Sequence, residues 1–127
     1  MRVYISGPMR GYPRWNFSAF DRAAAIWEQA GHTPISPAEV DRAIGFDPDG
    51  PAEQVSDAFV RNAFARDACL IIYTCDAIAL LPGWADSSGV SWELTLSLAL
   101  GHPVFDAFTR QPMSVDVSLT NREHVTP

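Results

Sequence analysis

The 127-residue chain contains no lysine, although it has nine arginines. Without lysine there is no Schiff-base amine and no lysine-dependent phosphate loop, which excludes both of these mechanisms. The formal net charge is −6, and an acidic surface of this kind argues against binding to DNA, RNA or an anionic membrane. Any anion that the protein binds must therefore contact arginine, hydroxyl groups or backbone N–H groups.

Cysteine and histidine are also scarce. The two cysteines, Cys69 and Cys75, share one apolar stretch at neither a metal-ligand nor a redox spacing, which predicts buried free thiols in a reducing compartment. The three histidines are scattered and form no HxxxH or His/Cys cluster, so we expect no zinc site. We predict neither a metal nor a cofactor.

Long hydrophobic runs are missing as well. No apolar segment is long enough to span a bilayer, and the N-terminus lacks the basic and apolar regions of a signal peptide. We therefore expect a cytoplasmic protein. The length, with 47% apolar and 19% charged residues, predicts one globular domain over residues 1–127.

Strand-like and helix-like segments alternate along the chain. Strands are predicted over 2–6, 32–36, 76–81 and 103–105, and helices from Ser18, with Asp21 completing a capping box, and from Glu53 onward. Residues 38–51 are rich in Asp, Pro and Gly and are predicted to form a surface loop. The segment after Phe108 is polar and irregular.

The segment from Val90 to Leu100 fits two patterns. Its apolar residues alternate with polar ones as in a strand, yet they are Leu and Ala rather than β-branched, and a serine cap precedes the segment. We assign a helix, because a strand–helix–strand order makes a parallel βαβ unit. The predicted fold is a doubly wound α/β sandwich with a parallel sheet.

Ligands of such sheets bind outside the carboxyl ends of the strands, which directs attention to two loops. The first, Gly7 to Asn16, contains two glycines that allow close backbone approach and two arginines, Arg10 and Arg14, that suit a phosphate or carboxylate. As a bare pattern, a Gly-Pro turn after a strand is more often structural than functional.

The second loop, Pro82 to Gly89, runs into the predicted helix. Its Asp86-Ser87-Ser88-Gly89 sequence offers hydroxyls and free N–H groups, which together bind anions, although Ser87 or Ser88 would equally serve as an ordinary helix cap. Glu93 follows in the first turns of the helix. If it faces a ligand, it is suited to acid–base or nucleophilic chemistry at a sugar carbon. These residues favour cleavage at a phosphate-bearing sugar.

Two motifs resemble those of the nucleoside 2-deoxyribosyltransferase superfamily. The first is Tyr4-Ile5-Ser6-Gly7-Pro8-Met9-Arg10-Gly11; the second is Asp76-Ala77-Ile78-Ala79-Leu80-Leu81-Pro82-Gly83-Trp84, followed by Ser87-Ser88-Gly89 and Glu93. The similarity spans residues 2–105 and is strongest to a branch found in phages and bacteria. It implies a three-layer flavodoxin-like fold and cleavage of the bond between a base and a deoxyribose.

The resemblance also implies roles for individual residues. Glu93 matches the nucleophile, Asp67 matches an aspartate that assists the nucleophile or the leaving base, and Trp15 and Phe17 are candidates for the base pocket. The candidate substrate-binding residues are Ser6, Gly7, Arg10, Gly11, Trp15, Phe17, Asp86, Ser87 and Gly89.

One position separates two branches of this superfamily. Transferases that act on free nucleosides carry Asp where Ser87 stands, whereas deoxynucleoside 5′-monophosphate N-hydrolases resemble this chain at Ser87, Gly89 and Glu93. A serine hydroxyl can donate a hydrogen bond to a 5′-phosphate, which a carboxylate would repel. The resemblance therefore favours a nucleotide substrate, although Asp86 lies next to this position.

Two other functions remain open on the sequence. The chain is compatible with a transferase that exchanges bases on free deoxynucleosides, and with a nucleotide-binding sensor that has no turnover. The superfamily also completes its sites with residues from a neighbouring subunit, so we expect a homodimer or larger homo-oligomer. Arg110, Gln111 and Ser114 in the tail are possible contributors.

Overall fold

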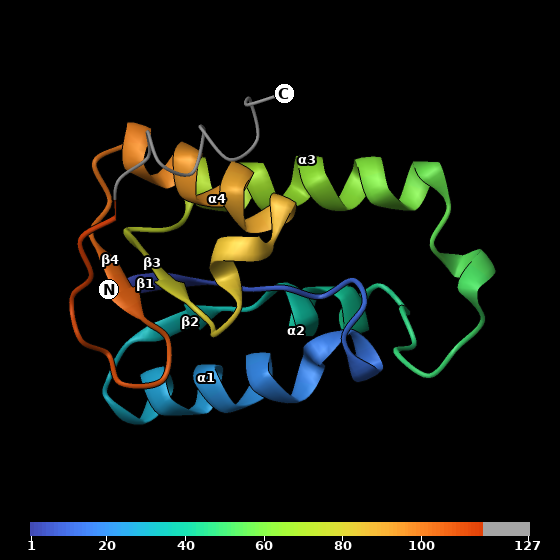
Figure 1. Cartoon of the computed structure of the whole chain (residues 1–127), viewed down its shortest axis with the longest axis horizontal. Helices are drawn as coiled ribbons and strands as arrows, with labels where there is room; N and C mark the ends of the chain where they lie inside the picture. Colours follow the sequence, from blue (N-terminus) through green and yellow to red (C-terminus); the bar gives the residue numbers. More distant parts are fainter. Residues whose placement is uncertain (116–127) are drawn as a thin grey trace.

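The computed structural model describes residues 1–115, and its centre is a parallel four-stranded sheet covered by helices on both faces (Figure 1). The strands are β1 (Arg2–Ser6), β2 (Thr33–Ile35), β3 (Ala77–Leu80) and β4 (Val104–Asp106), in the order β2-β1-β3-β4. The longer helices are α1 (Phe17–Gln29), α2 (Pro37–Ala43), α3 (Asp57–Tyr73) and α4 (Ser88–Ala99). The predicted three-layer α/β sandwich is confirmed, and this strand order is that of flavodoxin-like folds.

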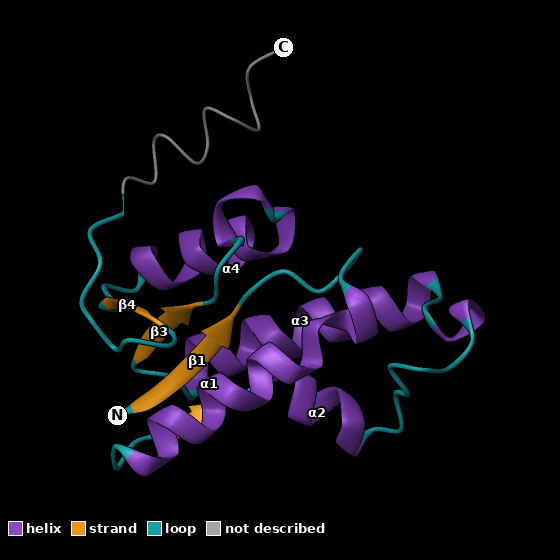
Figure 2. Ribbon diagram, turned by 60° about the horizontal axis from the view of Figure 1, so that its bottom comes forward, coloured by secondary structure: helices purple, strands orange, loops and turns teal. Residues whose placement is uncertain are grey.

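The two faces of the sheet bury different sets of side chains. Val3 and Ile5 of β1 pack in a cluster with α1 residues such as Phe20, whereas Tyr4 packs with Ile71 of α3 and the α4 residues Val90 and Leu94. Because side chains alternate along a strand, Ser6 lies on the same face as Tyr4. The end of β1 therefore presents two hydroxyl groups toward Glu93 of α4. Figure 2 shows α4 on one side of the strands and α1 on the other.

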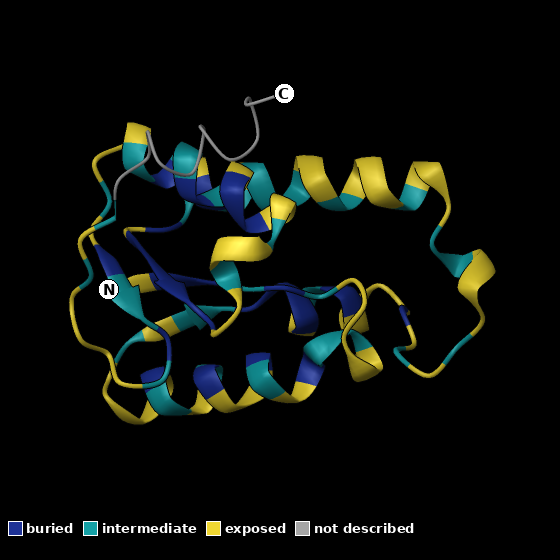
Figure 3. Ribbon diagram, in the orientation of Figure 1, coloured by how far each residue is buried: buried dark blue, intermediate teal, exposed yellow. Residues whose placement is uncertain are grey.

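The segment that fitted both a strand and a helix is the helix α4. Its buried residues Val90, Leu94 and Ser97 follow helical spacing and share the face against the sheet. The apolar stretch before β3 is also helical, because α3 continues without interruption to Tyr73. In Figure 1 the first half of α3 extends beyond the sheet, and Figure 3 shows it mostly exposed.

The loop predicted over residues 38–51 contains the helix α2, so this prediction was wrong in part. Pro37 occupies the first turn of α2, Glu39 lies in the same turn and Arg42 in the last, which are favourable positions for these residue types. The prediction failed because α2 is short, so that the Asp- and Gly-rich residues after it outweigh its own residues in the composition of the segment. This error matters because α2 contributes the buried Asp41.

The predicted cap of α1 was also wrong. The helix begins at Phe17, preceded by the short 3₁₀ helix η1 (Pro13–Asn16), and Asp21 pairs with Arg42 instead of closing a capping box. Arg14, Trp15 and Asn16 adopt left-handed conformations, with φ angles of 48°, 56° and 62°. The Asn16 side chain donates to the carbonyl of Pro8 at 2.9 Å, which ties this turn to the loop after β1.

Three further expectations have simple outcomes. Cys75 is buried as predicted, but Cys69 is exposed on α3, so the prediction for this thiol was wrong. Across residues 1–115, no helix is long and apolar enough to cross a membrane. Most of the tail suggested as a subunit contact lies outside the described residues, and Ser114, which is described, is exposed.

Candidate active site

A cavity of about 950 Å³ opens at the carboxyl ends of β1 and β3, bounded by the loops that follow them and by α3 and α4. This is where doubly wound sheets bind ligands, and the volume is large enough for a nucleotide-sized molecule. Gly7 allows the first loop to pass close to β3, because a β-carbon at this position would lie 2.6 Å from the β-carbon of Leu81.

The carboxylate of Glu93 lines this cavity and is held by two hydroxyl groups from β1. The Tyr4 hydroxyl donates to Oε2 at 2.5 Å, and the Ser6 hydroxyl donates to Oε1 at 2.6 Å. Tyr4 and Ser6 are both fully buried. Because each carboxylate oxygen has its own donor from a rigid strand, the carboxylate is fixed in one orientation.

Burial raises the pKa of Glu93 from 4.5 to about 7, with the Asp67 charge adding to the rise and the two hydroxyl hydrogen bonds opposing it. Burial also raises the pKa of Tyr4 well above its ordinary value, and the Glu93 charge acts in the same direction. Tyr4 therefore remains a proton donor at neutral pH. A carboxylic acid tuned close to neutrality inside a cavity is typical of a catalytic group.

Asp67 of α3 lines the same cavity and is a second acid with a raised pKa. Burial raises the pKa of Asp67 to about 6, opposed by the charge of Arg66 and augmented by that of Asp41. Tyr4, which donates to Glu93, also faces Asp67 and lowers its pKa. Two interacting acids near neutrality titrate as a pair and can divide the roles of acid and nucleophile.

The start of α4 forms the other end of the cavity. The Ser87 hydroxyl accepts from the backbone N–H of Val90 at 3.3 Å, so Ser87 is a helix cap, and it lines the cavity together with Gly89. A hydroxyl that accepts one hydrogen bond keeps its own proton to donate. The N-terminus of α4 and Arg10, also at the cavity, together provide the setting for a small anion.

The wall next to α2 and α3 is apolar and largely aromatic. Trp15 packs edge-on against Phe46, which stacks on Phe59 at a centroid distance of 5.2 Å, and all three line the cavity. The left-handed turn at residues 14–16 brings Trp15 to this wall. Flat apolar surfaces of this kind suit the faces of a heterocyclic base.

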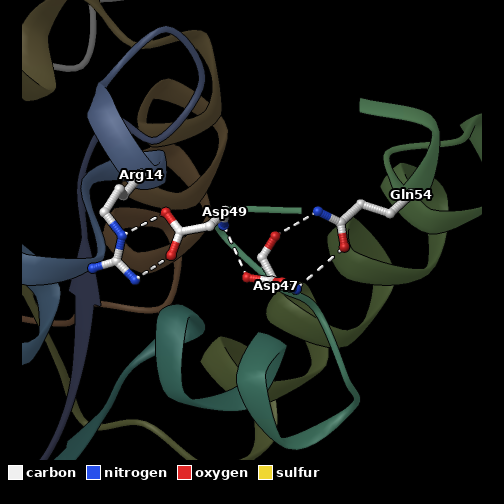
Figure 4. A network of polar contacts seen from close by, with 4 residues as sticks. All are labelled: Arg14, Asp47, Asp49 and Gln54. Atoms are coloured by element: carbon white, nitrogen blue, oxygen red, sulfur yellow. Dashed lines mark hydrogen bonds and ion pairs between the residues drawn. The ribbon is translucent and has the colours of Figure 1, made fainter. Parts of the chain in front are cut away.

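Arg14 does not serve as a cavity cation. Its guanidinium pairs with Asp49 through Nε at 2.8 Å and Nη2 at 2.9 Å, and the Asp49 backbone donates to Asp47, which also bonds Gln54 (Figure 4). This exposed network joins the loop after β1 to the segment before α3. Arg10 makes no hydrogen bond or ion pair within residues 1–115, so of the two loop arginines it is the one available to a ligand.

Most of the predicted site residues come together at the cavity. The residues that line it are Gly7, Arg10, Trp15, Asp67, Asp86, Ser87, Gly89 and Glu93. Ser6 lies beneath Glu93, to which its hydroxyl is committed, rather than on the cavity surface. Phe17 is buried in the core against Phe46, because it begins α1 below the turn that presents Trp15. Gly11 is exposed and does not line the cavity.

Several site residues were missed by reasoning from the sequence. Tyr4 lies two residues before Ser6, so strand alternation places both on one face, and this signal was available. Asp41 was missed because its segment was predicted to be a loop. Arg66 was missed because its contact with Asp41 joins α3 to α2, and the sequence does not show that these two helices meet. Arg110, Gln111 and Ser114 do not line the cavity. Within residues 1–115, no group of His, Cys, Asp and Glu side chains could hold a metal ion.

Comparison with known proteins bears on both sequence and fold. A family model described as "Domain of unknown function (DUF4406)" matches residues 1–106. No curated protein matches the sequence. A solved structure of a 2-deoxyribosyltransferase from the psychrotolerant bacterium Bacillus psychrosaccharolyticus has a TM-score of 0.62 and 22% identity, covering 95% of this chain and 81% of that one. At this identity the likeness shows a shared fold.

Proposed function

Since the chain belongs to the DUF4406 family, whose description states no activity, we infer its function from its site. We propose that the protein cleaves the N-glycosidic bond of a 2′-deoxynucleoside 5′-monophosphate, releasing the free base and deoxyribose 5-phosphate. The observation that carries this proposal is the Glu93 carboxylate, held by Tyr4 and Ser6 between an apolar wall and the N-terminus of α4. The solved structure with the same fold is that of a 2-deoxyribosyltransferase, whose name describes the transfer of a deoxyribosyl group, and this supports chemistry at the same sugar carbon.

In the first step, an oxygen of Glu93 attacks the anomeric carbon of the sugar. The carbon–oxygen bond of a glycosyl ester forms while the bond from this carbon to the base nitrogen breaks, and the bonding electrons leave with the base. Tyr4 and Ser6 hold the carboxylate in position, so orienting the nucleophile adds little to the activation free energy. Asp67 supplies a proton to the leaving base.

In the second step, water attacks the same carbon and gives up its proton to the Asp67 carboxylate. Deoxyribose 5-phosphate leaves, Glu93 is again a carboxylate and Asp67 is again protonated, so that the cycle is balanced. Two displacements at one carbon are the retaining mechanism of carboxylate glycosidases. The free enzyme must begin with Glu93 ionised and Asp67 protonated. Since the pKa of Glu93 is about 7 and that of Asp67 about 6, the single proton of the pair resides mainly on Glu93, and the reactive form is the minor one in which the proton has moved to Asp67.

We assign the 5′-phosphate of the proposed substrate to the start of α4. There the Ser87 hydroxyl proton, the N–H groups of Ser88 and Gly89 and the guanidinium of Arg10 are available, and the helix dipole favours an anion. Ser6, predicted among the substrate-binding residues, is assigned instead to Glu93 because its hydroxyl is already engaged. The base then lies along Trp15, Phe46 and Phe59.

The direct test is to incubate the protein with a panel of natural and modified deoxynucleoside monophosphates and to separate the products by chromatography. We expect free base and deoxyribose 5-phosphate in equal amounts for at least one substrate. Tight binding without product over long incubation would refute the proposal and favour the nucleotide sensor. The same panel identifies the base, with ribonucleotides as the matched control for the 2′ position.

Replacing Ser87 by Asp is expected to lower kcat/KM for the monophosphate by about 100-fold, because a carboxylate would face the phosphate dianion. Asp is itself a good helix cap, so α4 should remain folded. The matched control is Ser87→Asn, which has the same size and also caps a helix but adds no charge. Equal losses in the two variants would contradict a phosphate at this position.

Asp86 favours a second candidate, the transferase that exchanges bases on free deoxynucleosides. This carboxylate lines the cavity beside Ser87 and could accept a hydrogen bond from a sugar 5′-hydroxyl. Adding an acceptor base to a reaction with a free deoxynucleoside separates the two functions, since only a transferase forms the exchanged nucleoside. The expected homo-oligomer remains a prediction that light scattering can test.

A further inference from the structure

A partly buried arginine, Arg66, connects the active-site acid Asp67 to the helix α2. Nη2 of Arg66 donates to Oδ1 of Asp41 at 2.6 Å, and Nε of Arg66 lies 3.5 Å from Oδ1 of Asp67. The side chain of Asp41 is only 9% exposed, although it belongs to a short helix that packs against α1. Arg66 thus lies between two carboxylates that come from different helices.

The contact between Arg66 and Asp67 is incomplete. Nε of Arg66 and Oδ1 of Asp67 are both buried, and neither has a hydrogen-bond partner among the described residues. They face each other at a distance that is slightly too long for a hydrogen bond. A small rotation would close this gap when the carboxylate of Asp67 carries its full charge, and protonation of Asp67 weakens the attraction.

We propose that Arg66, anchored by Asp41, is a positioning residue that orients Asp67 and sets the pH range in which Asp67 holds its proton. The inference rests on the proposed function, because it gives Asp67 the role of proton donor. Asp41 prevents Arg66 from forming a full ion pair with Asp67, which would keep that carboxylate ionised. The Asp41–Arg66 pair therefore keeps Asp67 available as an acid.

Four groups face Asp67 and must be considered together: Arg66 beside it on α3, Asp41 on α2, Tyr4 on β1 and Glu93 on α4. Arg66 and Tyr4 lower the pKa of Asp67, whereas Asp41 raises it, and the Asp67 and Glu93 charges repel. Loss of Arg66 should therefore raise the pKa of Asp67, and loss of the Asp41 charge should lower it. The two halves of one ion pair thus have opposite effects.

The test compares Arg66→Gln with Asp41→Asn. On the substrate identified with the wild type, the limb of the pH profile of kcat that follows Asp67 should move up by about 1 pH unit in Arg66→Gln and down in Asp41→Asn. We also expect kcat to fall about tenfold in each variant, with KM nearly unchanged, because the misplaced acid is used only in the transition state. Arg66→Lys, which keeps the positive charge, should return this limb to the pH at which it lies in the wild type.

A second readout requires no turnover. The carboxyl carbon of Asp67, followed by NMR during a pH titration of the folded protein, should move in the same two directions, and this holds even if the proposed reaction is wrong. Arg42→Gln and Asp21→Asn are the matched controls, because they remove the exposed ion pair beside α2. If Arg66→Gln does not fold, the titration of Asp67 in Asp41→Asn alone tests the inference. Unchanged or parallel shifts in the titration of Asp67 would overturn the inference while leaving the proposed function untouched.

Discussion

Replacing Glu93 by Gln is expected to slow base release by at least about a thousandfold, because an amide oxygen cannot form the glycosyl ester. Gln has nearly the same shape and can still bond the hydroxyls of Tyr4 and Ser6. The loss should appear in kcat with each active monophosphate. Acid-quenched wild type should carry a covalent deoxyribosyl phosphate in its intact mass, and Glu93→Gln should not. The control is Glu28→Gln, at an exposed position of α1.

The same variant should be more stable than the wild type in alkaline solution. Burial raises the pKa of Glu93 from 4.5 to about 7, so the folded protein keeps a proton in this interval that the unfolded chain has released. The stability of the wild type must then fall as the pH rises through this interval, and Gln removes the effect. Thermal unfolding at about pH 5 and pH 8 measures this difference.

Equal base release by Glu93→Gln and wild type would exclude Glu93 as the nucleophile.

Replacing Asp67 by Asn is expected to lower kcat by about 100-fold, because the leaving base loses its proton donor. The wild type should have a bell-shaped pH profile with limbs near pH 6 and 7, the pKa values of the pair. In Asp67→Asn the basic limb should disappear. The remaining limb should follow the ionisation of Glu93 alone and lie below pH 7, because removing the Asp67 charge lowers the pKa of Glu93.

The substrate offers a control for this prediction. A deoxyribosyl phosphate with a more acidic leaving group needs less protonation, so Asp67→Asn should affect it much less than a natural nucleotide. The second ionisation of the phosphate is the same for both enzymes and cannot produce a difference between their profiles. If both kinds of substrate lose the same factor, Asp67 does not protonate the base.

The candidate site illustrates which features can be predicted from a sequence. Glu93, Ser87 and Gly7 could be placed because a parallel sheet brings the loops after its strands to one edge, whatever the details of packing. Tyr4 could have been placed by strand alternation alone. Arg66 and Asp41 could not, since their pairing depends on how α2 and α3 pack, and the short α2 was itself missed.

Arg14 shows a different limit. Its position in a loop beside the cavity suggested a phosphate ligand, but the structure directs its guanidinium to Asp49. That choice depends on a turn of three left-handed residues, and the local sequence contains no glycine at residues 14–16 that would indicate such a turn. Backbone conformations of this kind are set by tertiary contacts, which the local residues do not encode.

This turn also has an evolutionary consequence. A left-handed conformation costs roughly 1 kcal/mol or more for a residue such as Arg14 or Trp15 and less for an asparagine such as Asn16, so the turn works against the native state. Selection for thermal resistance alone would replace them and relax the turn, and Trp15 would then withdraw from the aromatic wall. The turn is therefore where we expect selection for heat tolerance and selection for substrate discrimination to oppose each other most directly.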